Sequence, residues 1–215
     1  RYESSAASDV YKRQKEFKSF IKSKKNKNKN KNIKNKLFVI DFKGNVRASE
    51  IVSLRREISG VLLSYKKGDE VLIRLENSGG TVHEHGLAAS QLKRIRDKKI
   101  PLTICVDKVA ASGGYMMACV GNKIIASPFA IIGSIGVLAQ VPNFNKLLKN
   151  KGIDFEQQTA GDFKRTVTMF GKNTEKDRKK LKEQLEDIHV LFKNFKKDNR
   201  QILDVEKVAT GEYWY

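Results

Sequence analysis

The spacing of apolar residues divides the first part of the chain into alternating strands and helices. Short apolar runs predict buried strands at 37–42, 70–76, 101–107 and 123–127. Apolar positions three or four residues apart predict amphipathic helices over 48–65 and 82–98. Strands that alternate with helices are typical of a layered α/β fold whose strands are largely parallel and joined by right-handed crossovers.

The second part of the chain is more irregular until it reaches a long helix. The pattern predicts a short helix at 112–121, an extended segment at 131–139, a helix at 143–152 and a strand at 153–158. Thr174 and Asp177 have the spacing of a capping box, which predicts where the long helix begins. One apolar stripe then repeats at four–three–four–three spacing, formed by Leu181, Leu185, Ile188, Phe192 and Phe195.

Positive charge is concentrated before the first predicted strand. The formal net charge is +19, and residues 1–36 hold 13 Lys and Arg against 3 Asp and Glu. This segment is rich in Lys and Asn, so it cannot bury enough apolar surface to offset its chain entropy and is predicted to be disordered. Residues 1–14 resemble nothing that follows and are set aside as a candidate non-native stretch. The folded domain is therefore predicted to be 37–215.

Composition excludes several classes of protein and site. A polybasic segment is attracted to anionic membranes and nucleic acid alike, but no nucleic-acid motif accompanies this one, so no specific nucleic-acid partner is expected. No apolar run approaches the roughly 18 residues of a membrane span, and no signal-peptide core is present, so the chain as given is predicted to be soluble. Cys105 and Cys119 lack metal-ligand spacing and are interpreted as buried free thiols.

Two predicted strands end in Gly-Gly turns that lead into helices. They are "ENSGG", residues 76–80, and "VAASGG", residues 109–114. Chemistry in parallel sheets gathers at the carboxyl ends of strands, and glycine pairs there expose backbone N–H groups that could hold an oxyanion. Ser112 is then a candidate nucleophile. The same residues also fit a plain tight turn with a helix N-cap.

The base for such a serine stays open on residue patterns alone. A Ser-His-Asp triad would need His83, His85 or His189 to reach Ser112. A desolvated lysine is the other class of base. The stretch "TAGDFKRTVTMFG", residues 159–171, places Lys164 in an apolar, glycine-flanked loop before the long helix.

Longer stretches carry a family resemblance that covers 37–215. "LFVIDFKGNVRASEIVSLRREI", "GLAASQLKRIRDKKIPLTICVDKVAASGGYMMAC" and "TAGDFKRTVTMFGKNTEKDR" resemble the signal peptide peptidase A family of serine peptidases, in particular its SohB branch. The resemblance implies a ClpP/crotonase-like fold of repeated β-β-α units. It implies a serine endopeptidase with a Ser112–Lys164 dyad, 52 residues apart, and backbone oxyanion donors at Gly113 and at Gly80 rather than Gly79.

The implied chemistry is acyl-enzyme hydrolysis of peptides or membrane-derived protein fragments, without a cofactor or metal. In this mechanism Lys164, with Phe163 and Met169 as apolar neighbours, takes the Ser112 proton. The resemblance also implies a homo-oligomeric ring and an inner-membrane protein, its catalytic domain on the periplasmic side and its N-terminal anchor absent here.

This sequence departs from the family at three points. The first glycine turn lacks the usual proline, which leaves its oxyanion donor less certain. Family members usually start with a transmembrane segment, and residues 1–36 contain no apolar run of that length. Family members continue past "ATGEYWY", so the peptidase domain is expected to be truncated at its C-terminus. Two alternatives to an active peptidase stay open: a catalytically silent ring-forming scaffold, and a crotonase-like acyl-CoA enzyme on the same fold.

Overall fold

A four-stranded parallel sheet forms the centre of the computed structural model, which describes residues 35–201 and 204–215. Its strand order is β1-β2-β3-β5, and Leu37–Tyr215 form one compact unit. The strands are β1 (Leu37–Lys43), β2 (Glu70–Glu76), β3 (Leu102–Val106) and β5 (Lys123–Ala126). The predicted α/β class with a parallel sheet is confirmed. The expectations for residues 1–34 lie outside the described residues.

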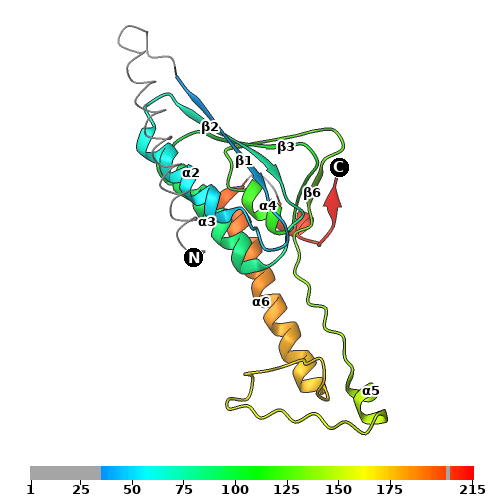
Figure 1. The fold of residues 1–215 in the computed structure, drawn as a ribbon. Helices are drawn as coiled ribbons and strands as arrows, with labels where there is room; N and C mark the ends of the chain where they lie inside the picture. The colour runs from blue at the N-terminus through cyan, green and yellow to red at the C-terminus, as the bar shows by residue number, and fades with distance from the viewer. Residues whose placement is uncertain (1–34, 202–203) are drawn as a thin grey trace, which may run out of the picture. The chain divides into compact units, whose positions relative to one another are not determined.

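Helices cover the face of this sheet that carries its buried side chains (Figure 1). Their bounds are α2 (Ile51–Ser64), α3 (Val82–Asp97) and α4 (Gly113–Ala118). The stripe predicted for α2 is buried at Ile51, Leu54, Ile58 and Val61. These residues join one apolar core with the inward residues of β2 and β3. Burial of such a face, more than helix propensity, is what holds helices of this length in place.

A second, smaller sheet brings together three short strands from distant parts of the chain. Its order is β4-β6-β7, and the strands are β4 (Val109–Ala111), β6 (Ile131–Gly133) and β7 (Tyr213–Trp214). β4 and β6 pair in parallel, whereas β7 is antiparallel to β6. An isolated parallel bridge between Asn77 and Ala110 joins the end of β2 to β4. This bridge brings the two glycine turns to the same edge.

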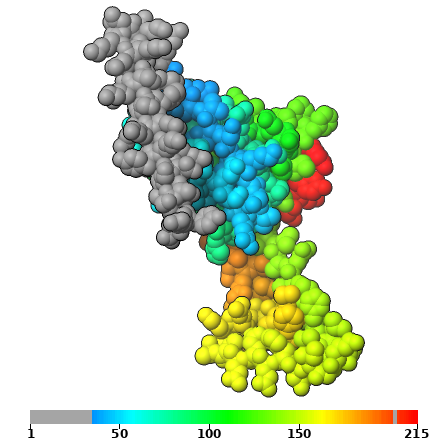
Figure 2. Space-filling model, in the orientation of Figure 1, coloured from blue at the N-terminus to red at the C-terminus, as the bar shows by residue number. Residues whose placement is uncertain are grey.

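The long helix α6 (Glu175–Asn199) begins at the predicted capping box. Thr174 Oγ1 accepts a hydrogen bond from Asp177 N, and the Asp177 carboxylate accepts one from Thr174 N. Phe192 and Lys196 are its buried residues, so its C-terminal half is attached to the core. The N-terminal half lies beside residues 138–173, hereafter the arm, which contains α5 (Asn145–Asn150). Figure 2 shows the arm, in yellow-green and yellow, gathered at the N-terminal end of orange α6.

Some predicted elements are corrected by the structure. The predicted strand at 153–158 is wrong: these residues are exposed coil. Alternating apolar residues favour a strand, but none of the described strands lies alongside to complete its hydrogen bonds. Of the extended segment at 131–139, only β6 pairs as a strand. The pattern missed β4, β7 and α7 (Val205–Val208), which are too short to show a period.

Within residues 35–201 and 204–215, each helix is too short or too polar to cross a bilayer.

The attachment of α6 can be tested with two neighbouring residues. Phe192 is 4% exposed and lies in the core, whereas Leu191 is 67% exposed. Phe192→Ala is expected to lower the free energy of unfolding by about 3–5 kcal/mol, because it removes a buried ring and leaves a cavity. Leu191→Ala is expected to change it by less than about 0.5 kcal/mol. Urea unfolding measures both, and equal effects would contradict the placement of α6.

Candidate active site

Ser112 lies in a strained turn between β4 and α4. Its φ of 50° and ψ of −118° are sparsely populated by residues other than glycine. Its amide donates to Gly133 O at 2.7 Å, and its carbonyl accepts from Met116 N at 2.9 Å. A conformation of this kind persists only where surrounding contacts impose it, and such residues cluster at functional sites.

The structure brings the two glycine turns into direct contact. A Cβ added to Gly79 would lie 2.7 Å from Ser112 Cβ and 2.9 Å from Gly113 N. Gly79 also has a φ of 92°, which strains any other residue. Only glycine therefore lets the first turn approach the serine this closely.

The three candidate oxyanion donors differ in what their amides do. Gly79 N donates to Asn77 Oδ1 at 2.7 Å, so its hydrogen is already engaged. Gly80 is exposed, and Gly113 opens α4, where a helical amide has no partner within its own helix. Among the described residues, neither Gly80 N nor Gly113 N has an acceptor. Both glycines, with Ser112, line one cavity.

The cavity beside Ser112 is small and mostly apolar. Its volume is about 20 Å³, room for about one water molecule. Apolar side chains complete its wall: Val82, Met116, Val137, Ile188 and Phe192. A substrate side chain would have to displace part of this wall to enter.

None of the three histidines contacts Ser112. His83 is exposed at the start of α3. His85 is fully buried, with its ring nitrogens 2.9 Å from Thr81 O and from Asn77 Oδ1. His189 Nε2 lies 3.2 Å from Ile135 O. Within the described residues, no histidine is therefore placed to take the serine proton.

Lys164 is exposed on the arm, away from the serine. Phe163 and Met169, its expected apolar neighbours, are themselves 45% and 41% exposed. The Phe163 ring lies 5.2 and 5.1 Å from the ammonium groups of Lys176 and Lys180, near the start of α6. Lys164 is thus not desolvated within a single chain.

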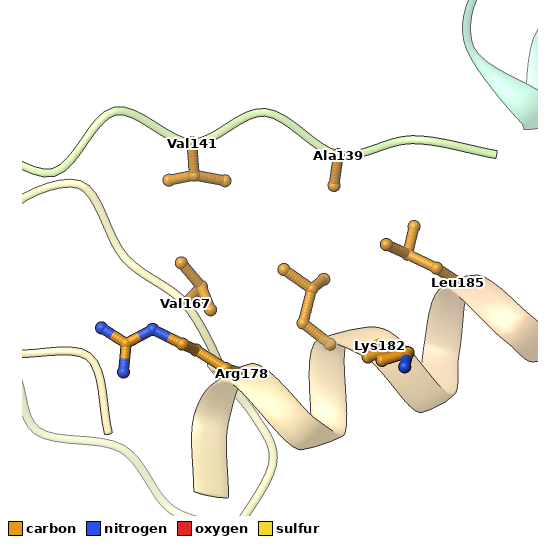
Figure 3. Close-up of a pocket in the computed structure, with 7 residues that line it drawn as sticks. Ala139, Val141, Val167, Arg178, Lys182 and Leu185 are labelled. Carbon is orange, nitrogen blue, oxygen red and sulfur yellow. The ribbon is translucent and has the colours of Figure 1, made fainter. Parts of the chain in front are cut away.

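The arm that carries Lys164 and the cavity beside Ser112 face different parts of the long helix α6. Val167, three residues after Lys164, shares a groove of about 260 Å³ with Arg178, Leu181 and Lys182. Figure 3 shows Val167, itself on the arm, between the stretch that carries Ala139 and Val141 and this part of the helix. The Ser112 cavity instead faces Ile188 and Phe192. Because Phe163, the residue before Lys164, lies near Lys176 and Lys180, this part of the arm faces the N-terminal half of α6, whereas the Ser112 cavity faces the C-terminal half.

The helix after Ser112 offers no competing nucleophile. Burial raises the pKa of the Cys119 thiol to about 12. It raises the pKa of Tyr115 on α4 to about 12 as well. Both groups stay protonated at neutral pH, and a buried thiol of this kind is inert.

Comparison with known proteins links the chain to one peptidase family. The sequence profile "Peptidase family S49" matches residues 94–215, and "Peptidase family S49 N-terminal" matches residues 3–92. The "Probable protease SohB" of Buchnera aphidicola subsp. Acyrthosiphon pisum is 63% identical over 182 residues, 85% of this chain and 54% of that protein. The "Probable protease SohB" of Haemophilus influenzae is 57% identical over 179 residues, 83% of this chain and 51% of that protein.

The chain therefore spans only about half the length of these relatives. Among solved structures, a mutant membrane-bound stomatin-specific protease with a bound substrate peptide matches at a TM-score of 0.43 and 24% identity. The match covers 51% of this chain and 49% of that one. A likeness this weak carries no weight for the site.

The contact between the second glycine turn and α3 predicts the effect of one added methyl group. A Cβ on Gly113 would lie 2.4 Å from Cγ of the buried His85 ring, so Gly113→Ala should cost about 1–3 kcal/mol of stability. Gly86→Ala, on the same α3 helix with nothing within 4 Å, should instead stabilise by about 0.5–1 kcal/mol. Thermal unfolding compares the two, and a neutral Gly113→Ala would refute the contact.

Proposed function

Since the chain belongs to peptidase family S49, we propose that it forms the catalytic part of a serine endopeptidase with Ser112 as its nucleophile. The observation that carries the proposal is the strained turn that brings Ser112 into one cavity with Gly80 and Gly113, whose amides have no acceptor among the described residues. Two convergent N–H groups beside a nucleophile are the arrangement that acyl transfer needs.

The proposed reaction proceeds through an acyl-enzyme. Ser112 Oγ attacks the peptide carbonyl, and its proton passes to a base. Gly80 N–H and Gly113 N–H hold the oxyanion, a role that Gly79 N–H cannot share while it donates to Asn77. The protonated base then gives its proton to the leaving amine, and water releases the acyl group from Ser112.

The proposed base is Lys164, supplied by a neighbouring copy of the chain. Within one chain Lys164 is exposed on the arm, whose Phe163 lies beside the N-terminal half of α6, whereas the Ser112 cavity faces Ile188 and Phe192. The arm also exposes apolar side chains that a single copy leaves uncovered: Leu147, Ile153, Phe155, Phe163 and Met169. An exposed apolar surface of this kind favours association. Burial between copies would desolvate Lys164, which is what a lysine base requires.

The finer assignments rest on the family resemblance. They are cleavage of peptides or membrane-derived fragments, a homo-oligomeric ring, and an inner-membrane location with the domain on the periplasmic side. The apolar wall around Ser112 is compatible with apolar peptide segments as substrates.

Removal of either member of the proposed dyad should abolish peptide hydrolysis. In the whole protein, Ser112→Ala and Lys164→Ala are each expected to lower kcat at least about 10³-fold, because nucleophile and base act as one unit. Ser90→Ala and Lys172→Ala, both at exposed positions, serve as matched controls. Hydrolysis of an unstructured peptide measures the rate, and a fluorophosphonate probe reports Ser112 directly.

The outcomes of this experiment separate the proposed function from its alternatives. Wild-type rates from both variants would refute the dyad. A folded oligomer that neither cleaves peptides nor reacts with the probe would be a silent scaffold. Thioester hydrolysis without peptide hydrolysis would indicate an acyl-CoA enzyme.

A base supplied by a neighbouring copy makes a separate prediction. When inactive Ser112→Ala and Lys164→Ala chains are unfolded and refolded together in equal amounts, about one quarter of the contacts between neighbours should pair an intact serine with an intact lysine. Activity should return to about that fraction of wild type. Each variant refolded alone is the control, and a mixture without activity would place both residues in one chain.

A further inference from the structure

His85 is a buried ring directly behind the candidate oxyanion site. Its exposed fraction is 0%, although His83, two residues earlier on the same helix, is exposed. A Cβ on Gly113 would lie 2.4 Å from His85 Cγ, so the imidazole packs against a residue that lines the Ser112 cavity. A buried polar ring needs hydrogen-bond partners for its nitrogens.

The orientation of Asn77 is fixed by two backbone groups that each have a single role. Gly79 N–H can only donate, and it lies 2.7 Å from Asn77 Oδ1. Gly44 O can only accept, and it lies 2.9 Å from Asn77 Nδ2. Reversing the amide would break both contacts, so the atom that faces His85 is the oxygen.

Both imidazole nitrogens of His85 therefore face acceptors. Nε2 lies 2.9 Å from Asn77 Oδ1, and Nδ1 lies 2.9 Å from the carbonyl oxygen of Thr81. Asn77 Oδ1 can only accept, so the contact with His85 is a hydrogen bond when Nε2 carries the hydrogen.

The surroundings of the imidazole supply no opposite charge. The groups against it from the first glycine turn and from α4, namely Asn77, Thr81 and Gly113, are neutral. No ion pair to His85 occurs among the described residues. The carboxylate beside Asn77 in sequence, Glu76, pairs with Lys43 and Lys108 instead. Glu84 is the adjacent carboxylate on α3 and is part-exposed.

We propose that His85 is a positioning residue for the oxyanion site, held between Thr81 and Asn77. By donating from Nε2 to Asn77 Oδ1 it helps to fix the amide that accepts from Gly79 N–H, and so sets the first glycine turn beside Ser112. The catalytic consequence rests on the peptidase function proposed above, whereas the hydrogen bond to Asn77 does not.

The hydrogen bond from Nε2 to Asn77 can be read by NMR without any assay of activity. The chain has three histidines, so labelling with ¹⁵N-histidine gives three ring systems, which His83→Gln and His189→Gln assign. Nε2 of His85 should show a directly bonded, slowly exchanging hydrogen, with the exposed His83 as internal reference. An Nε2 without a hydrogen would overturn the proposal.

The positioning role needs a kinetic readout that a purely structural role would not move. His85→Leu replaces the ring with an apolar side chain of similar size and removes its hydrogen bond to Asn77. The variant should lower kcat about 10²-fold with KM little changed, because the proposed oxyanion donors on the glycine turns would shift. His85→Gln can still donate to Asn77 Oδ1 and should recover at least about tenfold of that loss. His83→Leu, on the same turn of α3 but exposed, should match wild type.

Amide hydrogen exchange on the same variants separates a positioning role from loss of folding. In His85→Leu, the Gly79 amide should exchange faster than in wild type while the amides of β2 stay protected. Wild-type kcat in a folded His85→Leu protein would overturn the positioning role. If wild-type chain lacks peptide hydrolysis altogether, the proposed function fails, and the NMR and exchange results still decide the state and structural effect of His85.

Discussion

Five hydrogen bonds on Asn77 tie the two sheets to the helix that follows them. Its backbone donates to Val109 O and accepts from Ala111 N, which joins the end of β2 to β4. Its side chain contacts Gly44 O, Gly79 N and His85 Nε2. Because Asn77 is 1% exposed, each of these contacts must be kept or a buried polar group is left unsatisfied, at about 1–3 kcal/mol. The relative position of the two glycine turns follows from this one residue.

Glycines make this arrangement sterically possible on both sides of Asn77. A Cβ on Gly114 would lie 2.1 Å from Asn77 O, and one on Gly44 would lie 2.6 Å from Asn77 Nδ2. The backbone segments are thus packed at distances that no other residue allows. Close packing of this kind can impose the unfavourable dihedral angles of Ser112, because relaxing them would break the surrounding hydrogen bonds. Strain at the serine and order in the glycine turns have one common cause.

Sequence patterns correctly predicted the features that depend on interactions between residues close together in the chain. The strand at 70–76 and the start of α6 at Thr174 were predicted correctly, since alternation and capping are encoded by neighbouring residues. The pairing of Asn77 with His85 was not predicted, because a buried amide and a solvated one look alike in sequence. The strand predicted at 153–158 failed for the converse reason: a strand needs a partner, and its local pattern contains no information about one.

In the candidate site, too, local patterns indicated some residues, whereas contacts between distant parts of the chain could not be predicted. Local patterns singled out the Ser-Gly-Gly and Asn-Ser-Gly-Gly turns, whereas Lys164 was assigned through the family resemblance; the catalytic roles of all these residues stay predictions. In a single chain the fold brings Ser112, Gly80 and Gly113 to one cavity and leaves Lys164 exposed on the arm. On the proposed arrangement, an unassembled chain would hold a preorganised oxyanion cavity without a base to activate its serine. Assembly would then supply both the lysine and its desolvation, so hydrolysis would begin only where copies meet.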